Sequence, residues 1–327
     1  MEITLRSISR YLPSRRVSAD EMDDMLGVEE GWSLKATGVK QRFYSEGETT
    51  AQMGARALTQ ALHAAGMQAT DLDLLVGVSG TTQQPIPCTA ALLAAELGLR
   101  DSFCAFDVNA TCLGFLVGLD LIASQMHLGR YSTAALVASE IASVGLNLDQ
   151  KESAALFGDG SVAVILDNKS GQGIKILGTR FETFPEGASY CQIQGGSTGL
   201  HAKFFSDDNK DAYFFDMNGS KLFKLVAQRM VGFLQPLFER TGLTMDDIDL
   251  VIPHQASLSA LTLLRRRLGL TEERFFINVQ EQGNLIAASI PFALHDAIVQ
   301  GRVRKGDKIL LLGSSAGVSL GGVIIEY

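Results

Sequence analysis

Cysteines, prolines and long apolar runs are scarce in this sequence of 327 residues. Its four cysteines form no CxxC pair, which argues against a zinc site or a redox dithiol. No apolar run reaches the roughly 18 residues that a membrane helix needs. Residues 1–10 carry charges and alternate as a strand does, so we expect no signal peptide. Unpaired thiols then predict a cytoplasmic protein. The cysteines are Cys88, Cys104, Cys112 and Cys191.

Long basic runs are also missing, and the formal net charge is −8. This charge balance argues against a nucleic-acid partner. The chain has only 7 prolines but 33 glycines, a ratio that is typical of α/β proteins with tight turns between strands and helices. Its length predicts two domains or one larger α/β unit.

Two stretches of the chain resemble each other. Residues 66–76 read GMQATDLDLLV and residues 242–252 read GLTMDDIDLVI, an offset of 176. Each reads as a helix end, a turn and a buried strand. A second match, at an offset of 172, places Cys112 opposite Asn284; a helical stretch ending in Gly-Arg and an apolar strand follow each. Short matches arise by chance in α/β proteins, but two in the same order favour a duplication.

The duplication predicts an α/β fold made of two pseudo-symmetric halves, residues 1–168 and 169–327. Residues 167–171, DNKSG, read as the linker turn between them. In a duplicated fold, equivalent positions can meet near one axis. Cys112 and Asn284 would then face one pocket from opposite halves.

Cys112 has the sequence setting of a nucleophile. A predicted strand at 103–108 leads to it, and a predicted helix at 113–129 begins just after it. The helix N-terminus favours a thiolate, and its free N–H groups could hold an oxyanion. Gly114 leaves room for close backbone approach. The alternative is a buried structural cysteine, the most common role of an unpaired cysteine.

His254 and Asn284 are the other candidate catalytic residues. His254 follows a buried strand and precedes a predicted helix at 257–268, a position where α/β folds place their sites. Its imidazole can donate a hydrogen bond to a developing anion or transfer a proton. The amide of Asn284 offers a donor without a charge. A structural histidine and a capping asparagine are the alternatives.

The turn at 157–161 reads as structural, with Asp159 as a capping residue.

Together these motifs resemble those of the β-ketoacyl-acyl-carrier-protein synthase III family of the thiolase superfamily. Cys112 in ATCLGF, His254 in PHQA and Asn284 in GN match the Cys-His-Asn triad of that family in order and spacing. FGDG at 157–160 and TGV at 37–39 also match. The resemblance covers nearly the whole chain. It implies a five-layered αβαβα fold and a homodimer.

The resemblance also implies a two-step reaction without a metal or redox cofactor. Cys112 would accept an acyl group from a coenzyme A thioester. A malonyl group, usually on acyl carrier protein, would lose CO₂ and attack this acyl group. The product would be a 3-oxoacyl thioester of fatty-acid or related specialised biosynthesis. His254 and Asn284 would hold the enolate oxygen, and the N–H groups of Cys112 and Ala316 would form the oxyanion hole.

The family pattern assigns further residues to substrate binding. Trp32 would stack on the adenine of coenzyme A, and Lys151 matches its stacking partner. Gly219 and Ser220 belong to a segment that lines the pantetheine tunnel. The basic residues that would dock the carrier protein are Lys224, Arg266 and Arg267.

Several positions depart from the family pattern near the expected substrate sites. The family usually has an arginine beside the adenine, an aromatic residue that reaches the partner subunit and an arginine that docks the carrier protein. It also has a small polar pair after the asparagine and a glycine run in the last loop. This sequence has other residues at each of these places. These changes indicate a specialised member with a different acyl donor or acceptor. The positions are Ala36, Ile86, Ser259, Leu285-Ile286 and Ser315-Ala316-Gly317.

Two other functions stay open. The first is acyl transfer to an oxygen or nitrogen nucleophile without condensation, and the second is a catalytically silent partner subunit. Retention of both His254 and Asn284 favours condensation, and the complete triad argues against a silent subunit. A thiolase is disfavoured, because that family uses a second cysteine near its C-terminus and none follows Cys191.

Overall fold

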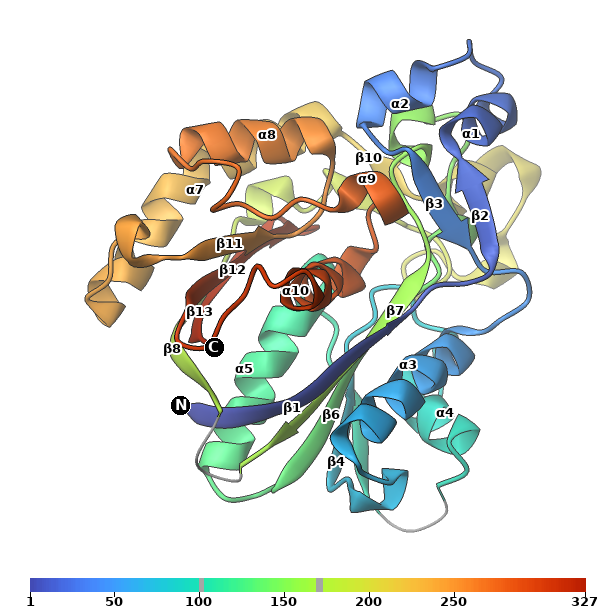
Figure 1. Cartoon of the computed structure of the whole chain (residues 1–327). Coiled ribbons are helices and arrows are strands. Elements are labelled where there is room, and N and C mark those ends of the chain that lie inside the picture. Colours follow the sequence, from blue (N-terminus) through green and yellow to red (C-terminus); the bar gives the residue numbers. More distant parts are fainter. Residues whose placement is uncertain (100–102, 169–172) are drawn as a thin grey trace.

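The structure is a computed structural model that describes residues 1–99, 103–168 and 173–327. Its framework is a sheet of nine strands in the order β11-β12-β13-β8-β1-β7-β6-β4-β5 (Figure 1). The strands are β1 (Glu2–Tyr11), β4 (Leu74–Gly77), β5 (Cys104–Asp107), β6 (Thr133–Glu140), β7 (Gly160–Asp167), β8 (Ile174–Thr183), β11 (Leu250–Pro253), β12 (Lys308–Ser315) and β13 (Ser319–Glu326).

The sheet consists of two parts with the same strand pattern. In the first part, β5, β4 and β6 are parallel, and β7 and β1 follow antiparallel. In the second part, β11 and β12 are parallel, and β13 and β8 follow antiparallel. A parallel bridge between Phe275 and Val251 of β11 takes the place that β5 has beside β4 in the first part. The parts join where Ile3 of β1 pairs with Ile174 of β8.

This pattern confirms the predicted α/β fold with two similar halves. The predicted linker lies partly outside the described residues, because residues 169–171 belong to a segment, 169–172, that the structure does not describe. The boundary between residues 168 and 169 therefore stays a prediction.

Helices form three layers around the two parts of the sheet (Figure 1). One pair covers the outer face of the first part, another pair covers the outer face of the second part, and a third pair lies between them. The result is the expected five-layered αβαβα arrangement. In that order the pairs are α3 (Thr50–Ala65) with α4 (Thr89–Glu96), α7 (Gly219–Thr241) with α8 (Leu258–Arg267), and α5 (Gly114–His127) with α10 (Ser289–Val299).

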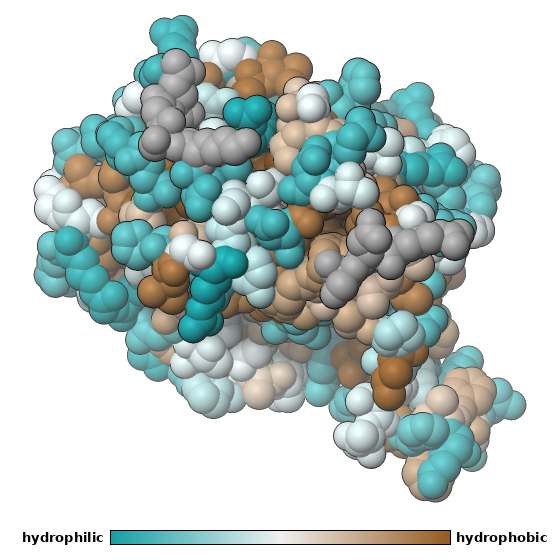
Figure 2. Space-filling view, turned by 90° about the horizontal axis from the view of Figure 1, so that it is seen from below, coloured by the Kyte–Doolittle hydropathy of each residue, from teal (hydrophilic) through white to brown (hydrophobic). Residues whose placement is uncertain are grey.

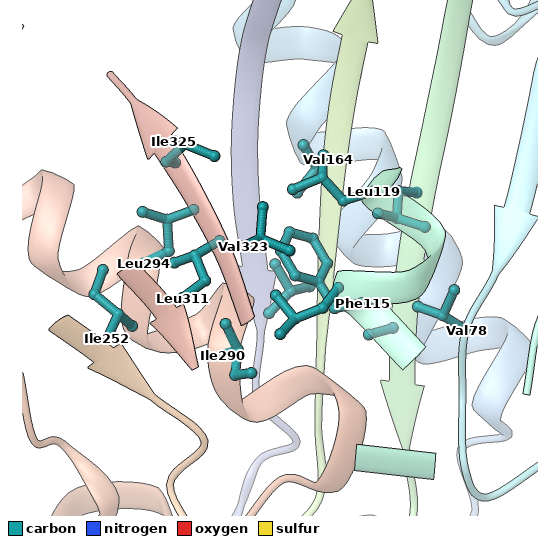
Figure 3. Close-up of a cluster of buried hydrophobic side chains, with 14 of the residues drawn as sticks. Val78, Phe115, Leu119, Val164, Ile252, Ile290, Leu294, Leu311, Val323 and Ile325 are labelled. Carbon is teal, nitrogen blue, oxygen red and sulfur yellow. The ribbon is translucent and has the colours of Figure 1, made fainter. Parts of the chain in front are cut away.

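The central layer forms the main core of the protein. Both of its helices have apolar sequences, as expected for helices that are covered by a sheet on either side. Figure 3 shows side chains of these two helices packed together with side chains from strands of both halves. They are Val78, Phe115, Leu119, Val164, Ile252, Ile290, Leu294, Leu311, Val323 and Ile325.

Smaller elements enclose one end of the sheet. They are β2 (Arg15–Ser18), α1 (Ala19–Leu26), α2 (Trp32–Thr37), β3 (Gln41–Tyr44), α6 (Lys151–Ala154), β9 (Cys191–Gln192), β10 (Asp216–Met217) and α9 (Val279–Gln282). Figure 2 shows apolar side chains scattered among polar ones on the face seen from below, and part of the chain projects at one corner. None of the helices in the described ranges has the length and apolar character needed to cross a bilayer.

Candidate active site

Cys112 lies in a tight turn between β5 and α5. The turn is a short 3-10 helix, Thr111–Leu113, so α5 begins just after Cys112 as the sequence predicts. Thr111 has a φ of 46°, in the left-handed region that β-branched residues rarely adopt. Its N–H donates to Asn109 Oδ1 at 3.0 Å, which holds the turn. A side chain at Gly114 would collide with the carbonyl oxygen of Val78, so glycine is required beneath the turn.

The surroundings of Cys112 work against the thiolate that the helix N-terminus predicts, although the residue is only half-buried and lines the cavity described below. Burial is the main cause, and the nearby charge of Glu140 adds to it; together they raise the pKa of Cys112 to about 12. One helix terminus does not offset the loss of water around the sulfur.

This pKa predicts the pH profile of Cys112 alkylation. Iodoacetamide reacts with the thiolate, so its rate at Cys112 should rise about tenfold per pH unit between pH 7 and 10, without a plateau. Peptide mapping by mass spectrometry separates Cys112 from the other cysteines. A plateau below pH 9 would contradict the raised pKa of Cys112 and support the thiolate.

His254 follows β11 directly and is fixed by its backbone. Its N–H donates to the carbonyl oxygen of Leu312 on β12 at 2.7 Å. The residue is 6% exposed, and burial lowers the pKa of His254 to about 4. Nδ1 is buried and has no hydrogen-bond partner among the described residues. An unpartnered lone pair costs less than an unpartnered N–H, so we assign the proton of the neutral ring to Nε2.

Asn284 is held so that its amide can donate. Its Oδ1 accepts from the N–H of Ile286 at 2.9 Å and from Ser289 Oγ at 3.3 Å. Both contacts go to the oxygen, so the NH₂ group stays available as a donor, and Asn284 lines the cavity. The N–H of Asn284 donates to the carbonyl oxygen of Leu156, just before the FGDG turn, and its carbonyl oxygen accepts from the N–H of Gly158 within the turn.

The FGDG turn therefore supports the site more directly than its sequence indicated. A side chain at Gly158 would collide with the carbonyl oxygen of Gln282, so this glycine permits the contact with the Asn284 segment. Asp159 caps, as predicted: it accepts from the N–H of Ser143 at 2.9 Å at the start of a short 3-10 helix, and also from the N–H of Ser45.

One cavity of about 1520 Å³ brings the three candidate residues together. Its wall includes Cys112 from the first half and His254, Asn284 and Ala316 from the second. These residues follow the carboxyl ends of β5, β11 and β12 or the helix α9. The arrangement combines a thiol, a neutral ring donor and an amide donor in one cavity, which suits acyl transfer and the stabilisation of an enolate.

The structural equivalence of the two halves differs from the one predicted by the second sequence match. Ile286, with a φ of 49°, opens a 3-10 helix before α10 as Thr111 opens one before α5. The offset is therefore 175 rather than 172. Cys112 corresponds to Ala287, and Asn284 corresponds to Asn109. The two catalytic candidates meet in one cavity although they are not equivalent positions.

The structure also locates the predicted substrate residues. Lys151, Gly219 and Ser220 line the cavity. Trp32 is half-buried against a small hydrophobic cluster apart from the main core. It is not among the described residues that line the cavity, although Ala36 of the same helix is. The predicted docking residues Lys224, Arg266 and Arg267 are exposed on α7 and α8, and Arg267 reaches the cavity wall.

Most positions that depart from the family pattern lie at the same wall. Ser315, Ala316, Ile286 and Ser259 line the cavity, whereas Leu285 is buried and Ile86 is 84% exposed on a loop. The side chains changed at the four lining positions therefore lie where a substrate would meet them. Sequence reasoning missed one buried group at the site, Glu140, although a charged residue that ends the apolar strand AALVASE was a usable signal.

Comparisons with known proteins agree with this site. Residues 106–185 match the family described as 3-oxoacyl-[acyl-carrier-protein] synthase III, and residues 238–327 match its C-terminal domain. A β-ketoacyl-[acyl-carrier-protein] synthase III of Clostridium perfringens is 32% identical over 97% of this chain and 96% of its own length. One from Aquifex aeolicus is 31% identical over 97% of each.

Solved structures show the same fold. The 3-oxoacyl-[acyl-carrier-protein] synthase III of Aquifex aeolicus superposes with a TM-score of 0.88 at 29% identity, over 99% of this chain and 100% of that one. OleA of Xanthomonas campestris superposes with a TM-score of 0.87 at 18% identity, over 100% and 99%. The second likeness concerns the fold alone.

Proposed function

Because the chain belongs to the 3-oxoacyl-[acyl-carrier-protein] synthase III family, we propose that it joins an acyl group on Cys112 to a malonyl thioester by decarboxylative condensation. The product is a 3-oxoacyl thioester of fatty-acid or related specialised biosynthesis. The observation that carries the proposal is the single cavity shared by the Cys112 thiol, the His254 ring and the Asn284 amide.

In the first step, Cys112 Sγ attacks the carbonyl carbon of an acyl-coenzyme A thioester. The tetrahedral oxygen accepts hydrogen bonds from the N–H groups of Cys112 and Ala316. The new C–S bond forms as the bond to coenzyme A breaks, and the thiol proton ends on the leaving sulfur. The exchange is therefore neutral in protons and electrons, and it stores the acyl group on the enzyme.

In the second step, the malonyl thioester loses CO₂, and its electron pair forms an enolate. The enolate oxygen accepts from His254 Nε2–H and from the Asn284 NH₂ group. The enolate carbon then attacks the acyl carbonyl, the bond to Cys112 Sγ breaks, and the released thiolate takes a proton from water. Condensation transfers no electrons to a redox partner, so the thioester substrates suffice without a cofactor.

The direct test is product analysis. The purified protein is given a panel of acyl-coenzyme A donors with malonyl-acyl carrier protein, and 3-oxoacyl product and released CO₂ are measured. Equal amounts of both support condensation. Acyl transfer to an added alcohol or amine, without CO₂, would favour the alternative transferase.

We further propose that the malonyl group arrives on an acyl carrier protein that docks at the mouth of the cavity. Carrier proteins of this kind act in the cytoplasm, which is where we place the reaction. Lys224 and Arg266 are exposed beside the mouth, where Lys221 and Arg267 line the wall. Exposed cations at a rim mainly steer association with an acidic partner.

The paired variant K224E/R266E should raise KM for malonyl-acyl carrier protein roughly tenfold or more, because two attractive contacts become repulsive. KM for malonyl-coenzyme A should change less than about threefold. K305E is the matched control, because Lys305 is exposed near the start of β12, at the opposite end of that strand from the cavity. Equal effects on both malonyl donors would argue against docking at this rim.

A homodimer is the proposed assembly. β5 forms one end of the sheet and pairs only with β4 within the described ranges. Its residues Cys104–Asp107 are half-buried in the single chain, and the edge of such a strand can pair with a second copy. Sedimentation at micromolar concentration should give twice the chain mass of 35.1 kDa. A monomer in the active preparation would contradict the assembly.

A further inference from the structure

A buried carboxylate beneath the cavity has no role in the two steps above. Glu140 is the last residue of β6 and is 0% exposed. Its Oε1 accepts from the N–H groups of Gly80 at 2.7 Å and Ala287 at 3.2 Å. Its Oε2 accepts from the N–H of Thr81 at 2.8 Å and from Thr81 Oγ at 2.5 Å. Four donors thus converge on one side chain.

These donors come from both halves of the fold. Gly80 and Thr81 follow β4, whereas Ala287 lies three residues after Asn284. One carboxylate therefore connects the loop after β4, in the first half, to the loop that carries Asn284, in the second half. None of the four donors belongs to the Cys112 turn at 111–113.

The contact with Ala287 bears directly on the direction of the Asn284 amide. Ile286 adopts a left-handed conformation with a φ of 49°, which is costly for a β-branched residue and needs support from its surroundings. Its own N–H donates to Asn284 Oδ1 at 2.9 Å, and the next N–H, that of Ala287, donates to Glu140. Both peptide planes beside the Ile286 Cα are thereby fixed.

Close packing around Gly80 leaves this carboxylate little freedom. A Cβ built at Gly80 would lie 2.9 Å from Ile286 Cγ2, 3.6 Å from Glu140 Oε1 and 3.7 Å from Thr111 Cα. The Cys112 turn and the Asn284 turn therefore approach each other across Gly80. The Glu140 side chain sits beside this junction with both oxygens occupied.

We propose that Glu140 is a positioning residue that holds the Asn284 amide in its donating direction, and that it serves condensation rather than acylation. The proposal rests on the condensation proposed above. All four partners of Glu140 are donors, as an ionised carboxylate requires. Burial raises the pKa of Glu140 to about 7, so the test is run at pH 8, where the carboxylate is mostly ionised.

The test is E140Q, assayed separately for the two steps. Glutamine has the same shape, but its NH₂ group faces donors and leaves buried N–H groups unpaired. We expect kcat for condensation to fall roughly 10- to 100-fold, the range for buried donors that lose their acceptor, with KM for the malonyl substrate little changed. The acylation rate of Cys112 should stay equal or rise, because the removed charge is one that raises the pKa of the thiol.

Asp73 provides a matched control at the other end of β6. Its Oδ2 accepts from the N–H groups of Ser132 at 2.8 Å and Thr133 at 3.0 Å, so D73N makes the same chemical change far from the cavity. D73N should leave both steps unchanged. The melting temperatures of both variants are measured alongside. If E140Q does not fold, E140D keeps the charge and shortens the reach to Ala287, and it should show the same split to a smaller degree.

A double-mutant cycle with N284A separates positioning from general structural support. If Glu140 acts through Asn284, E140Q should add less than about twofold to the condensation defect of N284A, because the group that it positions is already gone. Independent, multiplicative effects would overturn the proposal. So would equal losses of acylation and condensation in E140Q, or no loss of either. A wild-type protein that acylates without forming a 3-oxoacyl product would instead refute the proposed condensation.

Discussion

Replacing Cys112 by alanine is expected to lower acyl transfer by more than about 10⁴-fold, to the level of the background without enzyme. The physical reason is that no other thiol has the same combination of contacts: Cys112 alone sits on the tight turn before a helix, within the cavity shared by His254 and Asn284. Single-turnover transfer of a radiolabelled acyl group from acyl-coenzyme A measures the loss.

Cys191 supplies the control for this experiment. It is buried, and it lines the same cavity, but it lies on the short strand β9 rather than at a helix start. C191A should therefore acylate within a few-fold of wild type, and C112A should keep its melting temperature within a few degrees. Acylated protein recovered from C112A would show that another residue carries the acyl group.

Replacing Asn284 by aspartate should separate condensation from acylation more sharply than truncation does. Aspartate keeps the oxygen that accepts from the Ile286 N–H at 2.9 Å, and only the NH₂ donor is lost. A negative oxygen would then face the enolate. We expect condensation to fall by roughly 10²- to 10³-fold, as when one preorganised donor is removed from a developing oxyanion.

Acylation should continue in N284D, since Asn284 is proposed to act after the acyl-enzyme has formed. H254A should show the same split, because its Nε2–H is the second donor to the enolate. Rapid-quench measurement of the Cys112 adduct and steady-state CO₂ release report the two steps separately. An N284D variant that lost acylation as completely as C112A would show that the roles are not divided in this way.

The order of the elements and the candidate site residues could be proposed from local patterns. Each half is identified by the spacing of its apolar residues, by its turn residues and by the repeated segment at 66–76 and 242–252. These signals are local, because a buried strand and the helix before it each have a characteristic apolar pattern. Cys112 and His254 each follow such a strand, β5 in the first half and β11 in the second. Both residues line one cavity, as expected for a shared site, and their catalytic roles stay a prediction.

Features that depend on three-dimensional packing could not be predicted. The pKa of Cys112 is raised because segments distant in the sequence surround the thiol, and no local pattern reports those surroundings. The offset of 175 between Thr111 and Ile286 became visible only through their backbone angles. The four donors to Glu140 are far apart in the sequence, so the link between the two halves through this carboxylate needs the fold to be seen.

The central claim is that Cys112 carries the acyl group that the malonyl thioester then consumes. Intact-protein mass spectrometry, after incubation with acyl-coenzyme A donors from acetyl to dodecanoyl, tests it most directly. The account predicts a single acyl adduct, mapped to the peptide with Cys112, that disappears when malonyl-acyl carrier protein is added and 3-oxoacyl product forms. An adduct on any other residue, or one that persists with the malonyl substrate present, would contradict it.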